Sequence, residues 1–292
     1  MTESDRDDAP PPAADSPPAT EQDAEADDGE AERGKHSMTL LEHLRELRSR
    51  LVRCLIAVGV GFLVCYGFVD ILYGALIRPL ETSMLPNSHM IFTVLYGPFF
   101  VQLKIALLAG LMLASPYVFY QIWAFIAPGL YHEERRHIVP LAAVSALFFI
   151  AGAACCYLGV LPFAFGFFLS YSTDFVVAQP DIVDYFDFVL KLILAFGLIF
   201  EMPLFTLFLT RLGLITATTL RQYRRYAVLG NFVVAAILTP PDPYTLVLMA
   251  MPMLALYEIS ILLAAACGRK PAPETTPDES PDDHPDSTGD KA

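Results

Sequence analysis

Two glutamates and an aspartate lie in or beside long apolar segments, where an ionisable side chain is costly. Glu201 is the clearest case, because it lies inside the sequence AFGLIFEMPLF and Pro203 follows two residues later. A charged side chain at the centre of a bilayer costs about 2.5 kcal/mol or more, and a proline frees a backbone carbonyl group of a helix. Two interpretations stay open. Either the carboxyl group faces a water-filled concavity or the bundle interior and contacts a cargo or partner, or it is a protonated group hydrogen-bonded within a helix kink.

The other two acidic residues are more easily explained by local structure. Glu258, in LALYEISILL, is close enough to the end of its apolar segment to lean toward the membrane interface. Asp242 lies in the turn LTPPDPY, where Pro240, Pro241 and Pro243 restrict the backbone. The turn residues predict a rigid reversal of the chain, with Asp242 capping the helix that follows.

A second set of carboxylates lies outside the apolar segments. The charged loop GLYHEERRH, residues 129–137, places Glu133 and Glu134 beside two arginines, and Glu42 and Glu46 lie in an amphipathic segment near the N-terminus. Arginines alone would set the membrane topology of such a loop. The additional glutamates suit a ligand that displays guanidinium groups, because carboxylate and guanidinium can pair through two hydrogen bonds.

No pattern typical of catalysis, metal binding or nucleic-acid binding occurs in the sequence. The five cysteines contain no C-x-x-C pair and lie in or beside apolar segments, where free cysteine packs as a small apolar residue. The histidines have no metal-ligand spacing, and no phosphate-binding glycine loop or basic stripe with interleaved aromatics is present. We therefore expect no enzyme, metal, cofactor or nucleic-acid partner.

Apolar segments able to form membrane helices position these residues. They are predicted at about 51–73, 98–127, 138–162, 187–210, 226–238 and 245–267. At 1.5 Å per residue, the fifth segment is about 20 Å long, whereas the hydrocarbon core of a bilayer is about 30 Å thick. Six spans are therefore predicted, of which the fifth needs local thinning of the bilayer or shielding by its neighbours.

Charge divides the chain into three parts. Residues 1–37 hold 12 acidic and 3 basic side chains, residues 271–292 hold 7 and 1, and residues 38–270 hold 13 and 15. The acidic ends are poor in large apolar residues and are predicted to be disordered tails around a membrane domain. Twelve of the 15 basic residues of the middle part lie on one side of the predicted spans, so the positive-inside rule places both termini in the cytoplasm.

The segment MTLLEHLRELRSRLVR, residues 38–53, leads into the first span. Its leucines recur at helical spacing, which predicts an amphipathic interfacial helix. Thr39 and Glu42 have the spacing of a capping box, and Glu46 and Arg50 form an i, i+4 pair in the favourable order.

Five motifs resemble one known family. They are HLRELRSRL (43–51), SPYVFYQIWAFIAPGLYHEERR (115–136), PFAFGFF (162–168), AFGLIFEMP (195–203) and ILTPPDP (237–243). In order and spacing they are similar to the TatC subunit of the twin-arginine protein translocase, over essentially all of residues 38–270.

The resemblance implies a fold and a function. The fold would be an all-α integral membrane protein, with six helices forming a concave, glove-like wall and both termini cytoplasmic. The function would be to recognise twin-arginine signal peptides at the bacterial cytoplasmic membrane. Together with single-span TatA- and TatB-type partners, it would export folded proteins at the expense of the proton-motive force. A homo-oligomer in membrane lipid is also expected.

The resemblance also implies roles for individual residues. Glu46 and Glu134 match the family's main contacts to the signal-peptide arginines, with Arg48 and Glu133 on the same surface. Glu201 matches a glutamate that lines the intramembrane cavity.

Partner helices would dock near the turn that contains Pro240, Pro241 and Asp242. Leu246 occupies the position at which some members have a glutamine for a polar partner contact, so the detail of that contact stays open.

A different function weighed on the residues alone is a proton-coupled small-solute secondary transporter that uses Glu201 as a proton relay. Against it, the sequence shows no internal repeat and few intramembrane ionisable residues.

Overall fold

Helices make up most of the residues that the computed structural model describes, which are 21–84, 89–126, 138–173 and 178–267. An isolated parallel bridge joins Ile91 to Asp181. The helices in chain order are α1 (Glu21–Tyr66), α2 (Val69–Glu81), α3 (Gly97–Ile126), α4 (Ile138–Cys155), the π-helix η3 (Cys156–Val160), α5 (Leu161–Leu169), α6 (Ile182–Phe200), α7 (Met202–Arg211), α8 (Ala217–Gln222), α9 (Arg224–Leu238) and α10 (Pro243–Cys267).

The chain forms two compact units, residues 1–56 and residues 57–292. Helix α1 crosses the boundary between them and begins at Glu21, within the segment for which the sequence predicts a disordered tail. The predicted capping box at Thr39 is wrong, because the helix already runs through this position. A cap is needed only where backbone N–H groups lack an intrahelical partner.

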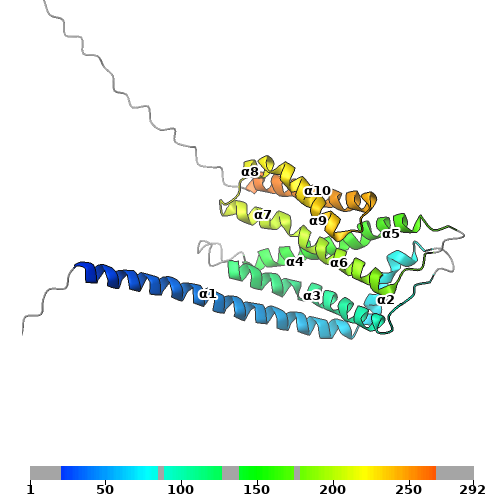
Figure 1. The fold of residues 1–292 in the computed structure, drawn as a ribbon, viewed down its shortest axis with the longest axis horizontal. Helices are drawn as coiled ribbons and strands as arrows, with labels where there is room; N and C mark the ends of the chain where they lie inside the picture. Colours follow the sequence, from blue (N-terminus) through cyan, green and yellow to red (C-terminus); the bar gives the residue numbers. More distant parts are fainter. Residues whose placement is uncertain (1–20, 85–88, 127–137, 174–177, 268–292) are drawn as a thin grey trace, which may run out of the picture. The chain divides into compact units, whose positions relative to one another are not determined.

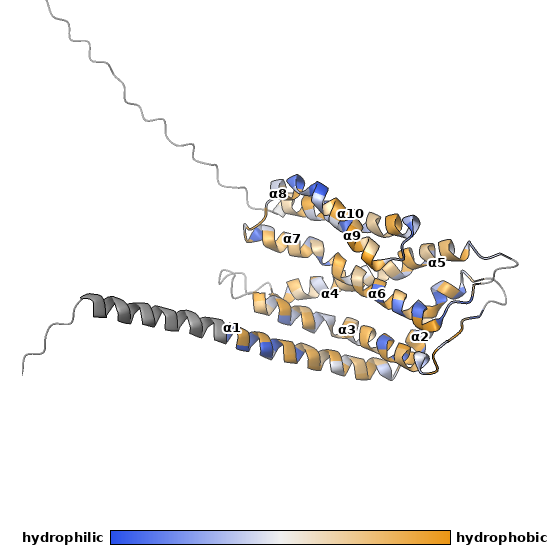
Figure 2. Cartoon of the chain, viewed as in Figure 1, coloured by the Kyte–Doolittle hydropathy of each residue, from blue (hydrophilic) through white to orange (hydrophobic). Residues whose placement is uncertain are grey.

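Five helical stretches are long and apolar enough to cross a membrane: Glu42–Tyr66, Gly97–Ile126, Ile138–Leu169, Ile182–Arg211 and Pro243–Ala266. The short fifth segment of the sequence prediction corresponds to α9, which has 15 residues. Figure 2 shows that hydrophobic residues dominate the spanning helices, whereas hydrophilic residues gather at α8. The chain is thus an all-helical membrane protein.

Two segments predicted as loops are partly helical. Residues 74–97 were expected to connect the first two spans, but α2 continues to Glu81 and buries Val69 and Leu80. Residues 163–186 were expected to follow the third span, but α5 continues that span to Leu169 after a π-helical turn. Pro162 lies in the first turn of α5, directly after the π-helical turn.

The second unit is built around α3, α4 and α6, which pack against one another, and α10 packs against α7, α8 and α9 (Figure 1). Its main core contains fully buried side chains from α3, α6 and α10, including Val101, Phe186, Phe196 and Met249. A second cluster around Phe119, Trp123, Phe149 and Leu204 joins α3, α4 and α7. These two clusters hold the elements that carry Glu201 and Leu246.

Glycines allow the closest helix contacts. A Cβ atom at Gly110 of α3 would lie 2.4 Å from the backbone nitrogen of Phe62, and one at Gly61 would lie 2.5 Å from the Gly110 carbonyl oxygen. The backbones of α1 and α3 therefore touch at this point. Small residues permit such an approach in membranes, where helix association depends on close packing.

Hydrogen bonds tie α2 and the segment after it to the rest of the second unit. The Tyr157 and Tyr185 hydroxyls donate to the carbonyl oxygens of Ala75 and Leu76, at 2.6 and 2.8 Å. The Asp181 carboxylate accepts from the amide and the hydroxyl of Thr93, at 2.9 and 2.8 Å.

Candidate functional site

Glu46 lies on α1, in the turns that precede the apolar part of the helix. Its Oε1 atom accepts from Nη2 and Nε of Arg50, at 2.7 and 2.9 Å. The predicted i, i+4 pair is thus confirmed. Both side chains keep some exposure, 20% for Arg50 and 37% for Glu46, so a ligand from solution can reach the carboxylate but has to compete with Arg50.

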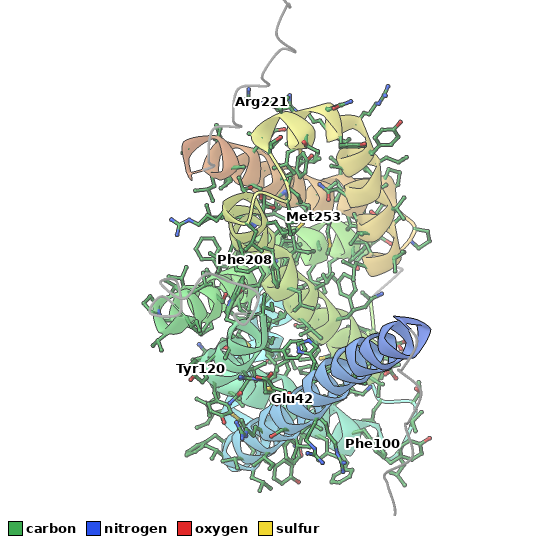
Figure 3. The ribbon with its side chains drawn as sticks, turned by 90° about the vertical axis from the view of Figure 1, so that its left-hand side faces the viewer. Glu42, Phe100, Tyr120, Phe208, Arg221 and Met253 are labelled. Carbon is green, nitrogen blue, oxygen red and sulfur yellow. The ribbon has the colours of Figure 1, made fainter. Side chains whose placement is uncertain are left out.

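The neighbours of Glu46 present further charge to solvent. Glu42 and Arg48 are exposed on the same helix, and Figure 3 labels Glu42. Glu133 and Glu134, the other two predicted binding residues, lie outside the described residues. The pairing of Glu46 with Glu134 around one ligand therefore stays a prediction.

Glu201 is the residue at which the fourth predicted span breaks. It ends α6 and precedes α7, whose first turn contains Pro203. Its side chain is buried, with 2% of its surface exposed. Ser145 of α4 lies close to the carboxyl group, yet neither carboxyl oxygen has a hydrogen-bond partner of acceptable geometry among the described residues. Burial of a carboxyl group carries a desolvation cost, which a hydrogen bond from the Ser145 hydroxyl would offset only in part.

The surroundings of Glu201 are built from three helices. The indole Nε1 of Trp123, on α3, donates to the Ser145 hydroxyl at 2.8 Å. Trp123 also packs against Phe208 of α7, with ring centroids 4.8 Å apart, and Figure 3 labels Phe208. The Ser145 hydroxyl accepts this hydrogen bond from the indole, so its own hydrogen is available to another acceptor. The nearby Glu201 carboxyl group is a candidate for that acceptor.

Asp242 caps α10, as the turn sequence predicts. Its Oδ1 atom accepts from the Thr245 amide at 2.7 Å, and its Oδ2 atom accepts from the Thr245 hydroxyl. The Asp242 amide donates to the carbonyl oxygen of Pro240 at 2.8 Å, which closes the turn. Pro240 and Pro241 are exposed at this reversal. An N-cap aspartate satisfies an orphan backbone N–H group at the third helical position.

The residues around this turn differ in polarity. Leu246 is partly buried and packs against the main core. Asn231 of α9 is 7% exposed, and its Nδ2 atom has no hydrogen-bond partner among the described residues. Position 246 thus offers a partner helix only apolar contact.

Three charged residues of the apolar helices have specific contacts. Glu258 pairs with Arg224 of α9, with an Nη2–Oε1 distance of 2.5 Å. Lys104 of α3 pairs with Asp187 of α6 at 2.6 Å. Lys191 donates to the carbonyl oxygen of Ile237 near the end of α9, at 2.7 Å. Each contact joins two different helices through residues at least 34 positions apart.

Several structural polar residues escaped the sequence analysis. Asp181 caps α6 by accepting from the Val183 amide at 2.7 Å, and the Thr93 hydroxyl is the main cause that lowers the pKa of its carboxyl group. An aspartate directly before an apolar run is an N-cap signal that could have identified it. Nothing in the local sequence pairs Trp123 with Ser145, because 22 residues separate them.

Within the described residues, no three His, Cys, Asp or Glu side chains come together as a metal site would require. The polar groups found there are a rim carboxylate on α1, a buried carboxyl group between α6 and α7, and a capped turn before α10. None of these described groups pairs a nucleophile with a base as catalysis would require.

A family model described as "Sec-independent protein translocase protein (TatC)" matches residues 42–252. The chain is 46% identical over 229 residues to the Sec-independent protein translocase protein TatC of Desulforapulum autotrophicum, a match that covers 78% of this chain and 85% of that protein. It is 42% identical over 222 residues to the protein of the same name from Escherichia coli K12, covering 76% and 86% of the two chains.

Solved structures give the same result. A structure described as "Crystal Structure of Twin Arginine Translocase Receptor- TatC" superposes with a TM-score of 0.70 at 40% sequence identity. The superposition covers 77% of this chain and 99% of that one. The acidic segments at the two ends contribute little to this likeness, since the family match begins at residue 42 and ends at residue 252.

Proposed function

Because the chain belongs to the TatC family of Sec-independent protein translocase proteins, we propose that it is the signal-peptide receptor and core subunit of a twin-arginine translocase. It exports folded proteins across the bacterial cytoplasmic membrane, using the proton-motive force and TatA- and TatB-type partners. The observation that carries the proposal is the likeness to a solved twin-arginine translocase receptor over nearly the whole of that structure.

Recognition rests on the carboxylates beside the first span. Glu46 and Glu134 each pair with one arginine of the signal peptide, and Glu133 and Arg48 complete the surface. A guanidinium group presents two parallel N–H donors to a carboxylate, which a lysine ammonium cannot reproduce. The site therefore selects arginine by geometry as well as by charge.

The membrane arrangement has six spans, with α9 as a short fifth span and both termini in the cytoplasm. The five long apolar stretches and the apolar α9 support this count, and the distribution of arginines supports the orientation. Labelling of single cysteines introduced at the N-terminus and in the turn at Asp242 tests it in intact cells. Protection of the turn cysteine with exposure of the N-terminal one would reverse the orientation and remove the rim carboxylates from the cytoplasm.

Two further parts of the site follow from the same family membership. The apolar part of the signal peptide enters a concave membrane face beside Glu201. Single-span partners, and further copies of this chain, dock near Pro240, Pro241, Asp242 and Leu246. The burial of the Glu201 carboxyl group within a predicted span supports the first of these assignments, because an intramembrane ionisable residue is a functional-site hypothesis by default.

The signal-peptide site is tested with the double substitution E46Q/E134Q in the full chain. Photocrosslinking of a twin-arginine precursor to this variant should fall about tenfold, the loss expected when two exposed charge-assisted pairs are removed. The matched control is E42Q, which removes an exposed carboxylate from the same helix. A precursor with both arginines replaced by lysine should bind the unaltered protein as weakly as the variant binds the twin-arginine precursor. Undiminished crosslinking to E46Q/E134Q would refute the assigned site.

A further inference from the structure

An arginine-rich surface lies where α7 ends, α8 runs and α9 begins. It consists of the exposed side chains of Arg211, Arg221, Arg224 and Arg225, with Tyr223 and Tyr226 between them. We call this set the arginine surface. Figure 2 shows that α8 is hydrophilic, and Figure 3 labels Arg221 at this end of the second unit.

Few carboxylates of the surrounding helices balance this charge. From residue 202 to residue 267 the chain contains one aspartate, Asp242, and one glutamate, Glu258. Asp242 caps the opposite end of α10, and Glu258 is paired with Arg224. Arg225 lies over the Tyr226 ring at 5.0 Å, which orients its guanidinium group without neutralising it. The structure gives Arg211, Arg221 and Arg225 no carboxylate partner in the part of the chain that it describes.

The C-terminal end of α10 lies close to the arginine surface. Helix α8 packs against α10 (Figure 1), and the Tyr257 hydroxyl donates to the carbonyl oxygen of Leu220 at 2.8 Å. From Glu258, which touches Arg224, to Cys267 the helix advances about 13.5 Å at 1.5 Å per residue. The chain therefore leaves α10 about 14 Å along the helix axis from Glu258, the residue that contacts Arg224.

The sequence that follows α10 has the opposite charge. Residues 271–292 contain seven acidic side chains, the first at Glu274 and the last at Asp290, and one basic side chain. Seven extended residues beyond Cys267 reach about 24 Å, more than the helical rise of about 13.5 Å back to Glu258, which contacts Arg224. No other acidic segment of the second unit has this charge density.

We propose that the acidic segment 274–290 docks on the arginine surface of the same chain. Its carboxylates pair with the unneutralised guanidinium groups of Arg211, Arg221 and Arg225. The short connection from α10 keeps the segment at an effective concentration in the millimolar range, so weak exposed ion pairs suffice to hold it. Anionic lipid headgroups have the same charge and compete for these arginines, but they lack the covalent connection.

The full chain tests this proposal through the rate of disulfide formation between two introduced cysteines. All five native cysteines are replaced, and T218C on α8 is combined with S287C in the acidic segment. The protein is placed in nanodiscs of phosphatidylethanolamine and phosphatidylglycerol. Docking should speed crosslinking, and R221Q/R225Q should slow it about threefold or more, the factor that two weak exposed ion pairs give.

Two changes separate docking from other causes. Replacing the seven acidic residues of the segment by their amides should slow crosslinking by the same factor, although it leaves the membrane domain unaltered. Raising the salt concentration from 0.1 to 1 M should do so too, because the Debye length falls from about 10 to about 3 Å. The matched control R78Q removes an exposed arginine from α2 and should leave the rate unchanged.

A crosslinking rate that is insensitive to R221Q/R225Q or to neutralisation of the segment would overturn the proposal. The proposal would also be overturned if R221Q/R225Q slowed crosslinking only in nanodiscs without phosphatidylglycerol. In that case the headgroups of phosphatidylglycerol would occupy the arginine surface whenever this lipid is present. Signal-peptide binding is a separate measurement, so a failure here leaves the proposed function untouched.

Discussion

Replacing Arg50 by glutamine should strengthen the binding of a twin-arginine signal peptide. In the structure Nη2 and Nε of Arg50 donate to Oε1 of Glu46, at 2.7 and 2.9 Å. An incoming arginine has to break or share this pair before it can form its own. Removing Arg50 frees the carboxylate, and this prediction depends on the proposed role of Glu46.

The magnitude follows from the geometry and exposure of the pair. Exposed i, i+4 pairs on helices contribute about 0.3–0.5 kcal/mol, and well-oriented arginine pairs approach about 1 kcal/mol. Because the two side chains are 20% and 37% exposed, solvent screens the pair and keeps it within this range. Release of that free energy corresponds to an affinity gain of about two- to fivefold.

The assay is fluorescence anisotropy of a labelled twin-arginine signal peptide added to the full chain in nanodiscs, with R53Q as the matched control. Arg53 is exposed on the same helix, so R53Q removes the same charge without freeing Glu46. The difference between the two variants isolates the pairing from general electrostatics. Weaker binding to R50Q than to R53Q would refute the reasoning, because Arg50 would then position Glu46 for the ligand instead of competing with it.

Three other perturbations test the fold that carries the site. Because a Cβ atom at Gly110 would lie 2.4 Å from a backbone nitrogen, G110A should destabilise the protein by about 1–3 kcal/mol in thermal unfolding. The control G230A, at a glycine with nothing within 4 Å, should be neutral or stabilising by up to about 1 kcal/mol. D242A should cost about 0.5–2 kcal/mol through the lost cap and speed amide hydrogen exchange in the first turn of α10; unchanged exchange there would contradict the capping role. The Thr93 hydroxyl lowers the pKa of the Asp181 carboxyl group below its usual 3.8. The ionised carboxylate should therefore stabilise the folded protein fully above pH 3.8, and this stabilisation should be lost as the pH falls through the lowered pKa. The contribution of Asp181 to the fall in melting temperature between pH 5 and pH 2 should be absent in D181N. A pH profile of the melting temperature that D181N leaves unaltered would exclude Asp181 as a source of that fall.

The amino-acid sequence by itself determined the features that depend on neighbours within a few residues. Apolar segments of the right length predicted the helices α3, α9 and α10 nearly to their ends. The spacing of Glu46 and Arg50 predicted their ion pair, and the prolines around Asp242 predicted a capped turn. Each of these contacts spans three or four residues, so helical geometry alone brings the groups together.

The tertiary structure decided the features that join distant parts of the chain. The C-terminal part of α2 lies where a loop was predicted, because Leu80 becomes buried in the main core. The carboxyl group of Glu201 is buried beside Ser145, which Trp123 holds from a third helix. The ion pair of Lys104 with Asp187 crosses 83 residues. No local pattern encodes such pairings, because they form only when packing of apolar faces sets the position of one helix against another.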